Sequence, residues 1–214
     1  REGCHVLSDP SGLERAATKL YLHHVPPRFR PRTMIGRDPE ALLTFVRELE
    51  GPCVLKPLRG THGRDVFRIA GPGADNARQI MEILSRHGHV IAQEFIPEAV
   101  DGDVRLILVD GELLEVDGHP AALRRIPGEG DFRSNIHAGG RAAPVELTDA
   151  MREMVEAVGP LLAADGIFMA GVDFIGGVLV EINVFSPGGL RDCHRFYEAD
   201  FTGEVVRRAV ASTR

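Results

Sequence analysis

The sequence predicts an α/β chain folded into two α+β lobes that meet near residues 93–97 and enclose a cleft. In the first half, short apolar runs typical of strands alternate with amphipathic helical segments. In the second half, two Asp-Gly pairs separate runs of alternating polarity, a pattern typical of antiparallel hairpins. The length of 214 residues allows one or two compact units, each with its own core.

Composition and charge argue against several classes of protein. The chain is 43% hydrophobic and 26% charged, which is ordinary globular composition. Its net charge of -6 argues against a nucleic-acid or membrane partner. The three cysteines lie far apart without zinc-binding spacing, so we expect a reducing, cytoplasmic setting. Residue 1 is Arg rather than Met, so we expect a piece of a longer protein.

The first lobe, residues 1–93, is expected to alternate strands with helices. Asp38 followed by Pro39 indicates a helix start, because Asp caps helices and Pro is favoured at the first helical position. Residues 1–10 are interpreted as the tail of a preceding domain. We expect helices at 11–23, 39–49 and 75–87, and strands at 32–35, 52–57, 66–69 and 90–96.

The second lobe, residues 94–214, begins with the two Asp-Gly hairpins. A polar, glycine-rich loop over 127–141 follows, too long for a simple turn and of a kind that is often functional. A capped helix is predicted over 148–166, because Thr148 precedes an apolar-periodic run that ends in Gly166. We expect a hairpin of two largely buried strands within 166–185, then helices near 188–198 and 201–212.

Polar residues interrupt the apolar run VLVEINVFSP, residues 178–187. Glu181 and Asn183 share one face of the predicted strand. A buried carboxylate needs a partner, which is a lysine or arginine, a hydrogen-bond network or a metal ion. A three-residue loop at 176–178 would place Asp173 opposite Glu181, whereas a two-residue turn would turn it to the other face. Two carboxylates and an amide oxygen suit Mg²⁺; the alternative is a polar strand end facing solvent or an arginine.

Basic residues follow the predicted strands and the glycine-rich loop. Lys56 ends an apolar strand before a loop with Gly60 and Gly63, whose backbone N–H groups could approach phosphate oxygens, although no GK[ST] follows as in a P-loop. The only other lysine is Lys19, for which a solvated helix face is the alternative. Arginines suit contacts with phosphate or carboxylate, and a long loop can close over a substrate. The candidates are Arg105, Arg125 and, in the loop, Arg133 with Asn135.

Five segments together resemble the ATP-grasp domain of bacterial glutathione synthetase, over nearly the whole chain. They are VLKPLRGTHGRDVF (54–67), AQEFIP (92–97), DGDVRLILVDGE (101–112), RRIPGEGDFRSNIHAGG (124–140) and GVDFIGGVLVEINVFSPGGLRD (171–192). The last two are the most specific. The resemblance implies the ATP-grasp fold, with nucleotide bound in the cleft between two lobes, and without the domain that precedes it in the family.

The resemblance also implies roles for individual residues. The ATP phosphates would contact Lys19 and Lys56 and would be covered by the loop that contains Gly60, His62 and Gly63. The adenine would lie in a pocket formed by Gln93, Glu94, Phe95 and Ile96. Asp103 would lie on the ribose and substrate side. The transferred phosphoryl group and substrate carboxylates would contact Arg105, Arg125 and Asn135. The substrate pocket would include Arg133, Gly139, Gly140, Ser186, Pro187 and Gly188. Mg²⁺, or Mn²⁺ as an alternative, would bind Asp173, Glu181 and Asn183.

The implied activity is an ATP-dependent carboxylate–amine ligase that joins γ-glutamylcysteine to glycine. Two alternatives stay open: a ligase for another amino-acid or peptide pair, and an ATP-binding module without turnover. The implied partners are a small-molecule or short-peptide substrate, and a homo-oligomer or the absent N-terminal domain. One departure concerns the segment between Arg105 and Arg125, which is a few residues longer than the family pattern. We therefore expect an altered hairpin near the site.

Overall fold

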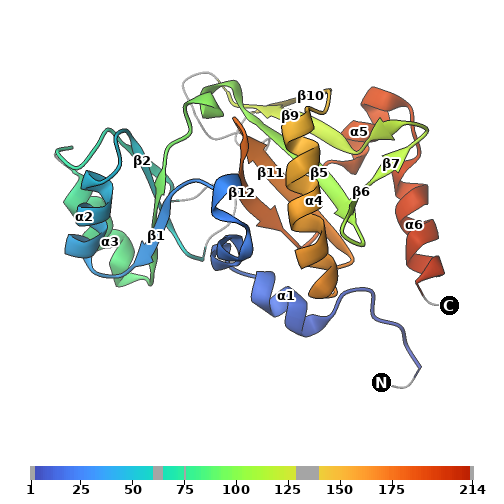
Figure 1. Cartoon of the computed structure of the whole chain (residues 1–214), viewed down its shortest axis with the longest axis horizontal. Coiled ribbons are helices and arrows are strands. Elements are labelled where there is room, and N and C mark those ends of the chain that lie inside the picture. Colours follow the sequence, from blue (N-terminus) through green and yellow to red (C-terminus); the bar gives the residue numbers. More distant parts are fainter. Residues whose placement is uncertain (1–2, 60–64, 75, 129–139, 213–214) are drawn as a thin grey trace.

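The computed structural model describes residues 3–59, 65–74, 76–128 and 140–212, and these contain two larger antiparallel sheets (Figure 1). The first sheet has the strand order β1-β4-β2-β3. Its strands are β1 (Thr33–Gly36), β2 (Cys53–Pro57), β3 (Phe67–Ile69) and β4 (Val90–Glu94). The predicted strands of the first half are thus present, although all of their pairings are antiparallel.

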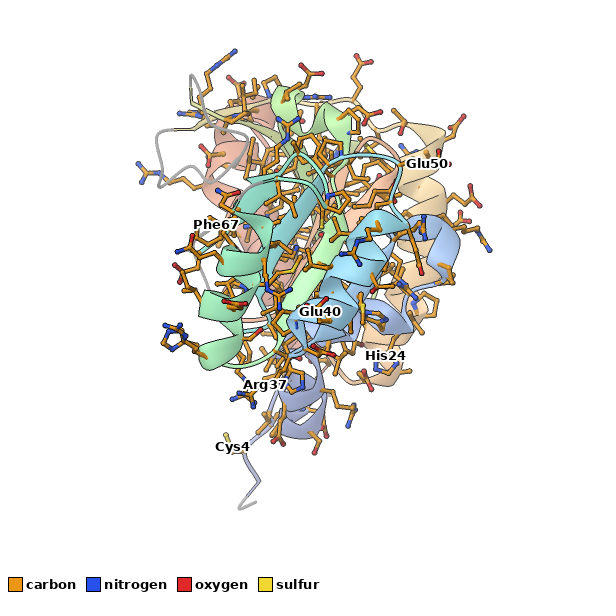
Figure 2. All side chains as sticks on the ribbon, turned by 90° about the vertical axis from the view of Figure 1, so that its left-hand side faces the viewer. Cys4, His24, Arg37, Glu40, Glu50 and Phe67 are labelled. Atoms are coloured by element: carbon orange, nitrogen blue, oxygen red, sulfur yellow. The ribbon has the colours of Figure 1, made fainter. Side chains whose placement is uncertain are left out.

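Helices α2 (Pro39–Arg47) and α3 (Ala77–Arg86) cover one face of the first sheet. Figure 2 shows both helices in front of the strands. Asp38 accepts a hydrogen bond from the Glu40 N–H, which confirms the predicted cap of α2. Leu42, Leu55 and Met81 are fully buried between helices and sheet. Side chains alternate along each strand, so Lys56 and Gln93 lie on the opposite face of the sheet, away from these helices.

The second sheet has the order β10-β9-β5-β11-β12, with β6 paired to β5. Its strands are β5 (Asp103–Val109), β6 (Glu112–Leu113), β9 (Ala122–Ile126), β10 (Arg141–Ala143), β11 (Met169–Ile175) and β12 (Val178–Asn183). Helix α4 (Asp149–Ala164) covers one face, and α5 (Leu190–Tyr197) and α6 (Phe201–Ala211) cover part of the other (Figure 1). The rest of that second face carries polar side chains.

The predicted helix over 11–23 is wrong in one respect, because two short helices occupy this range. Helix α1 (Pro10–Ala16) is followed by the 3-10 helix η1 (Lys19–His24). Between them Thr18 is extended, with φ -121° and ψ 154°, so the α-helix cannot continue through it. The break places Lys19 at the start of η1.

Residues of the predicted first lobe also pack beside the second sheet. Tyr21, Leu22, Val25 and Phe29 are buried with residues of β5, β11 and α4, because their apolar side chains complete that core. The 3-10 helix η2 (Pro27–Phe29) lies against β12. Residues 19–29 thus pack on the second sheet and lead directly into β1 of the first sheet. The division of the chain at residues 93 and 94 stays a prediction.

Two Asp-Gly pairs, Asp110-Gly111 and Asp117-Gly118, form tight turns, which confirms the two predicted hairpins. Asp110 and Gly111 have φ values of 53° and 78°, and Asp117 and Gly118 have values of 52° and 80°, as type I′ turns require. The second turn joins β7 (Glu115–Val116) to β8 (His119–Pro120). This hairpin packs on α6, and the His119 ring stacks on Tyr197. The β7–β8 hairpin thus lies on the side of α6, and the expectation of an altered hairpin near the site stays a prediction.

The three cysteines are unpaired. Cys53 and Cys193 are buried, and burial raises the pKa of both thiols to about 12. Cys4 lies on the N-terminal segment, which extends away from the body in Figure 2. Within the described ranges, no helix combines the length and apolar character that a membrane span requires.

Candidate functional site

The hairpin of β11 and β12 positions the predicted metal ligands. Asp173 pairs directly with Glu181, and Gly171 pairs with Asn183, so these side chains share one face. The predicted pairing is confirmed, but the predicted three-residue loop is wrong. Ile175 pairs with Val178 across a two-residue turn of Gly176 and Gly177, both with positive φ. A register shift beside Asp173 leaves Val180 as the extra residue and restores the pairing.

Asp173 is the most engaged side chain of this face. Its Oδ1 accepts from Arg105 Nε at 2.7 Å, and its Oδ2 accepts from Arg105 Nη2 at 2.7 Å. Arg125 Nη2 lies 2.8 Å from Oδ2, and Asn183 Nδ2 donates to it at 3.1 Å. Asp173 is 1% exposed. Oδ2 thus receives three of these four contacts and Oδ1 receives one, so two arginines and an amide hold Asp173 mainly through Oδ2.

Asp103 extends the cluster across β5 and β9. It pairs with Arg125 in the sheet, and its two oxygens accept from Arg125 Nε and Nη2 at 2.6 and 2.7 Å. Burial and the neighbouring Asp173 charge raise the pKa of Asp103, whereas Arg125 lowers it less. Burial also opposes ionisation of Asp173, but Arg125 and Arg105 outweigh it and hold that pKa below its usual value. The two buried carboxylates thus share Arg125, and Asp173 alone also binds Arg105.

Glu181 makes a different ion pair. Its Oε1 lies 3.2 Å from Lys19 Nζ, at the start of η1, and its side chain is 37% exposed. Two carboxylates and an amide on one face are the donor set that Mg²⁺ prefers, so these residues fit the ion in kind. Among described residues, no group of three or more His, Cys, Asp and Glu could hold a metal; the predicted set has two carboxylates and one amide. On Asp173, Oδ1 accepts from one donor, Arg105 Nε, and is the oxygen with an acceptor position left for a metal.

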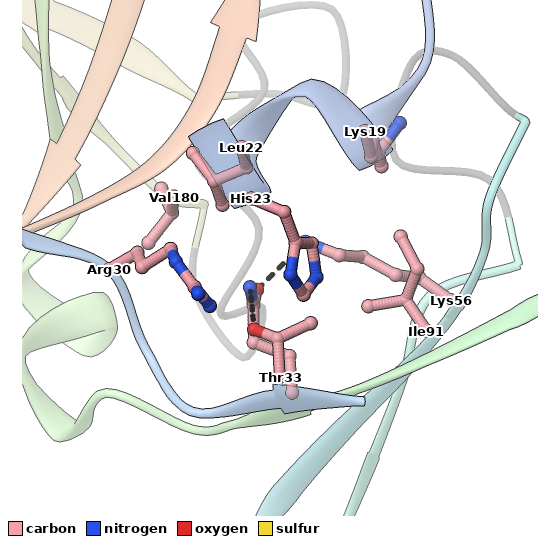
Figure 3. A pocket seen from close by; sticks show the side chains of 9 residues that line it. Lys19, Leu22, His23, Arg30, Thr33, Lys56, Ile91 and Val180 are labelled. Atoms are coloured by element: carbon pink, nitrogen blue, oxygen red, sulfur yellow. Dashed lines mark hydrogen bonds between the residues drawn. The ribbon is translucent and has the colours of Figure 1, made fainter. Parts of the chain in front are cut away.

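Lys56 lies on the uncovered face of the first sheet, two residues beyond Val54, which pairs with Gln93. Its Nζ donates to Gln93 Oε1 at 2.9 Å, and Gln93 Nε2 donates to Thr33 Oγ1 at 3.0 Å. The dashed lines in Figure 3 mark these two bonds. Burial, and to a lesser degree the charge of Lys19, lower the pKa of Lys56 to about 8, although Glu181 raises it.

A hollow separates Lys56 from the residues of η1 and β12 (Figure 3). It is small, because the volume open to a water molecule is about 10 Å³. Lys19 also lines a second hollow beside it, together with Glu181. The first hollow is lined by Lys19, Leu22, His23, Arg30, Thr33, Lys56, Ile91, Gln93 and Val180. Both lysines of the chain therefore meet at one place, between the two sheets.

The segment predicted to line the adenine pocket follows β4. The Glu94 N–H donates to Arg32 O, and the Phe95 N–H donates to Pro52 O. The Phe95 ring is buried under the Arg68 guanidinium, 4.2 Å from the ring centre. Ile96 is half-buried and caps η3 (Pro97–Asp101). The role of Gln93, Glu94, Phe95 and Ile96 at adenine stays a prediction, and in this structure the Gln93 side chain contacts Lys56 instead.

The predicted substrate segment after β12 passes over the polar face. A Cβ built on Gly171 would lie 2.8 Å from Pro187 Cβ and 3.5 Å from Arg105 Nε, so only glycine leaves room for this approach. Ser186 has a φ of 50°, which is strained for a residue with a side chain. Gly188 is exposed. Ser186, Pro187 and Gly188 thus lie beside Arg105, although their substrate role stays a prediction.

Several predicted residues fall outside the described ranges. They are Gly60, His62, Gly63, Arg133, Asn135 and Gly139. Gly140 is described and precedes β10. Sequence reasoning missed Thr33 and Arg30, which line the hollow. Only the pairing of Thr33 with Gln93 across β1 and β4 could have indicated Thr33.

Comparisons with known proteins identify the family of this chain. The model of the prokaryotic glutathione synthetase ATP-grasp domain matches residues 18–198. The chain is 38% identical over 210 residues to the glutathione synthetase of Parasynechococcus marenigrum (strain WH8102), across 97% of this chain and 66% of that relative. It is 37% identical over 207 residues to the enzyme of Vibrio cholerae (serotype O1, strain ATCC 39315 / El Tor Inaba N16961), across 96% and 63%. The chain therefore spans slightly less than two thirds of these relatives.

Solved structures show the same fold. The ATP-grasp ligase PsnB complexed with minimal precursor has a TM-score of 0.71 at 23% identity, across 100% of this chain and 65% of that one. The D-cycloserine synthetase DcsG has a TM-score of 0.72 at 19% identity, across 96% and 73%. The predicted fold class is thereby confirmed. The chain belongs to the prokaryotic glutathione synthetase ATP-grasp family.

Proposed function

We propose that this chain is the catalytic part of an ATP-dependent ligase that joins γ-glutamylcysteine to glycine through an acyl phosphate. The observation that carries the proposal is one polar face between two sheets, with Lys19 and Lys56 on one side and the Asp173 cluster on the other. Proteins of this family use ATP and Mg²⁺. We further propose a cytoplasmic setting, as the cysteine pattern predicts.

The reaction consists of two balanced steps. A carboxylate oxygen of the substrate attacks the γ-phosphorus of ATP, the bond to the β–γ bridging oxygen breaks, and ADP leaves. The amine nitrogen then attacks the acyl carbon, the bond from carbon to the phosphate oxygen breaks, and the amine loses a proton as the amide forms. Protein groups contribute by positioning and by stabilising charge, so no nucleophilic side chain is needed.

The chain's own residues divide this work. Lys19 and Lys56 would neutralise phosphate oxygens in the hollow, and Arg105 and Arg125 would orient the substrate carboxylate and the transferred phosphoryl group. Asp173, Glu181 and Asn183 would hold Mg²⁺, which supplies charge stabilisation at the phosphates when bound. Ser186, Pro187 and Gly188 would form one wall for the peptide substrate, because this segment lies over Arg105.

The test is ADP release with Mg-ATP, measured without substrate, with γ-glutamylcysteine plus glycine, and with other acid–amine pairs. We expect release with γ-glutamylcysteine plus glycine, in equal amount to the peptide product. Release with another pair alone would keep the mechanism and replace the substrate. ATP binding without release from any pair would instead support an ATP-binding module.

A further inference from the structure

Lys56 is held by a neutral side chain. Its Nζ lies 2.9 Å from Gln93 Oε1, and among the described residues it makes no salt bridge. A neutral acceptor fixes an ammonium without cancelling its charge, whereas a carboxylate at the same place would cancel it. Gln93 is 5% exposed, so this contact is screened from bulk water. The cation is therefore positioned and still available to an anion.

The Gln93 amide is itself fixed from the other side. The Thr33 hydroxyl donates to Pro31 O at 2.9 Å, so its oxygen accepts from Gln93 Nε2 at 3.0 Å. This arrangement sets which end of the amide is nitrogen, and it leaves Oε1 facing Lys56. The backbone supports the same order, because Thr33 pairs with Gln93 across β1 and β4. A chain of three hydrogen bonds thus runs from Pro31 O to the ammonium of Lys56.

Three members of this chain of hydrogen bonds lie at the hollow. Thr33, Gln93 and Lys56 line it, with Lys19 on its opposite side (Figure 3). We propose that Gln93 and Thr33 are positioning residues for Lys56: the Thr33 hydroxyl fixes the Gln93 amide, and the amide holds the Lys56 ammonium, uncancelled, for a nucleotide phosphate. This inference rests on the proposed function. It assigns the Gln93 side chain to the phosphate end of the nucleotide rather than to adenine.

The experiment is a double-mutant cycle on the dissociation constant of Mg-ATP, measured by calorimetry. The variants are Gln93→Leu, Lys56→Met and the double variant. Each single change is expected to raise the Kd about tenfold, as loss of a hydrogen bond to a charged group implies. The double variant should bind no more weakly than Lys56→Met alone, because Gln93 acts only through Lys56. A general structural role of Gln93 would weaken binding by the same factor in both backgrounds, and that result would overturn the inference.

Three further variants sharpen the test. Gln93→Glu keeps an acceptor but cancels the charge, so it should also raise the Kd; an unchanged Kd would contradict the role of the neutral amide. Thr33→Val should raise the Kd about threefold, and only when Lys56 is present. It also replaces Gln93→Leu if that variant does not fold. Thr44→Val is the matched control and should leave the Kd unchanged. The Thr44 hydroxyl also donates to a backbone oxygen, that of Glu40, but on the exposed side of α2.

Failure of this inference differs from failure of the proposed function. If Lys56→Met weakens Mg-ATP binding but Gln93→Leu and Thr33→Val do not, Lys56 is a phosphate ligand that needs no positioning, and the inference alone is wrong. If Lys56→Met leaves the Kd unchanged, the phosphate role of Lys56 is wrong as well, and both statements are overturned.

Discussion

Asp173 carries two possible functions in one side chain, because it is both a predicted metal ligand and the counter-ion of Arg105 and Arg125. Its oxygens accept from both arginines and from Asn183. The sequence left open whether the acidic pair would meet a cation, a hydrogen-bond network or a metal. In the structure Asp173 and Glu181 meet cations. The sequence could not decide this, because Arg105 is 68 residues from Asp173 in the chain.

Asp173→Asn should destabilise the fold, because it leaves two arginines in a nearly closed site without their shared counter-ion. Breaking a buried pair in this way costs about 3–5 kcal/mol of the free energy of unfolding. Urea unfolding measures it. Asp192→Asn is the matched control, since the ion pair of Asp192 with Arg195 is exposed and worth under about 1 kcal/mol. Equal, small losses in both variants would contradict the buried network.

Glu181→Gln should abolish Mg-dependent ADP formation while leaving the fold intact. Glu181 is partly exposed and contacts Lys19, so its removal leaves no deeply buried charge, but it removes a carboxylate from the proposed Mg²⁺ site. ADP release and thermal unfolding are measured together, with Glu153→Gln as the control because Glu153 is an exposed side chain of α4. Unchanged ADP release in Glu181→Gln would remove it from the metal site.

The β11–β12 hairpin decides which face the site residues take. The sequence leaves a two-residue turn or a three-residue loop open at Gly176-Gly177. The structure has the two-residue turn, from which simple alternation would separate Asp173 from Glu181. The bulge at Val180 restores them to one face. A bulge depends on packing across several strands, so the local sequence does not predict it. Capping residues and Asp-Gly turns are local features, and for this reason α2 and both hairpins were predictable.

Helix α4 depends on a close approach that the sequence also conceals. A Cβ on Gly159 would lie 1.9 Å from the carbonyl oxygen of Gly111, in the turn between β5 and β6. Gly→Ala inside a helix ordinarily stabilises by about 0.5–1 kcal/mol. Here we expect Gly159→Ala to destabilise the protein, because α4 must move away from the sheet. Unfolding in urea checks the sign, and a gain in stability would contradict the packing of α4 on that turn.

Across the whole molecule, the site exists only because distant segments meet. The hollow joins η1, β1, β2, β4 and β12, which no single motif connects. The resemblance supplied the fold class and the candidate residues, since its motifs are specific in sequence. It did not indicate which side chains these residues contact in the structure, such as the hydrogen bond from Lys56 to Gln93. Such contacts depend on how the two sheets face each other, and that arrangement is set by the packing of residues 16–29 on the second sheet.

The chain's two lysines allow a direct test of the central claim that Mg-ATP binds in this hollow. Both are predicted phosphate ligands, and the other 23 basic residues are arginines. Dimethylating the lysines with ¹³C gives one NMR signal for each, besides that of the N-terminus. We predict that Mg-ATP shifts both lysine signals with a common saturation curve. If ATP saturates the protein and both lysine signals stay where they are, the nucleotide binds elsewhere and the account is wrong.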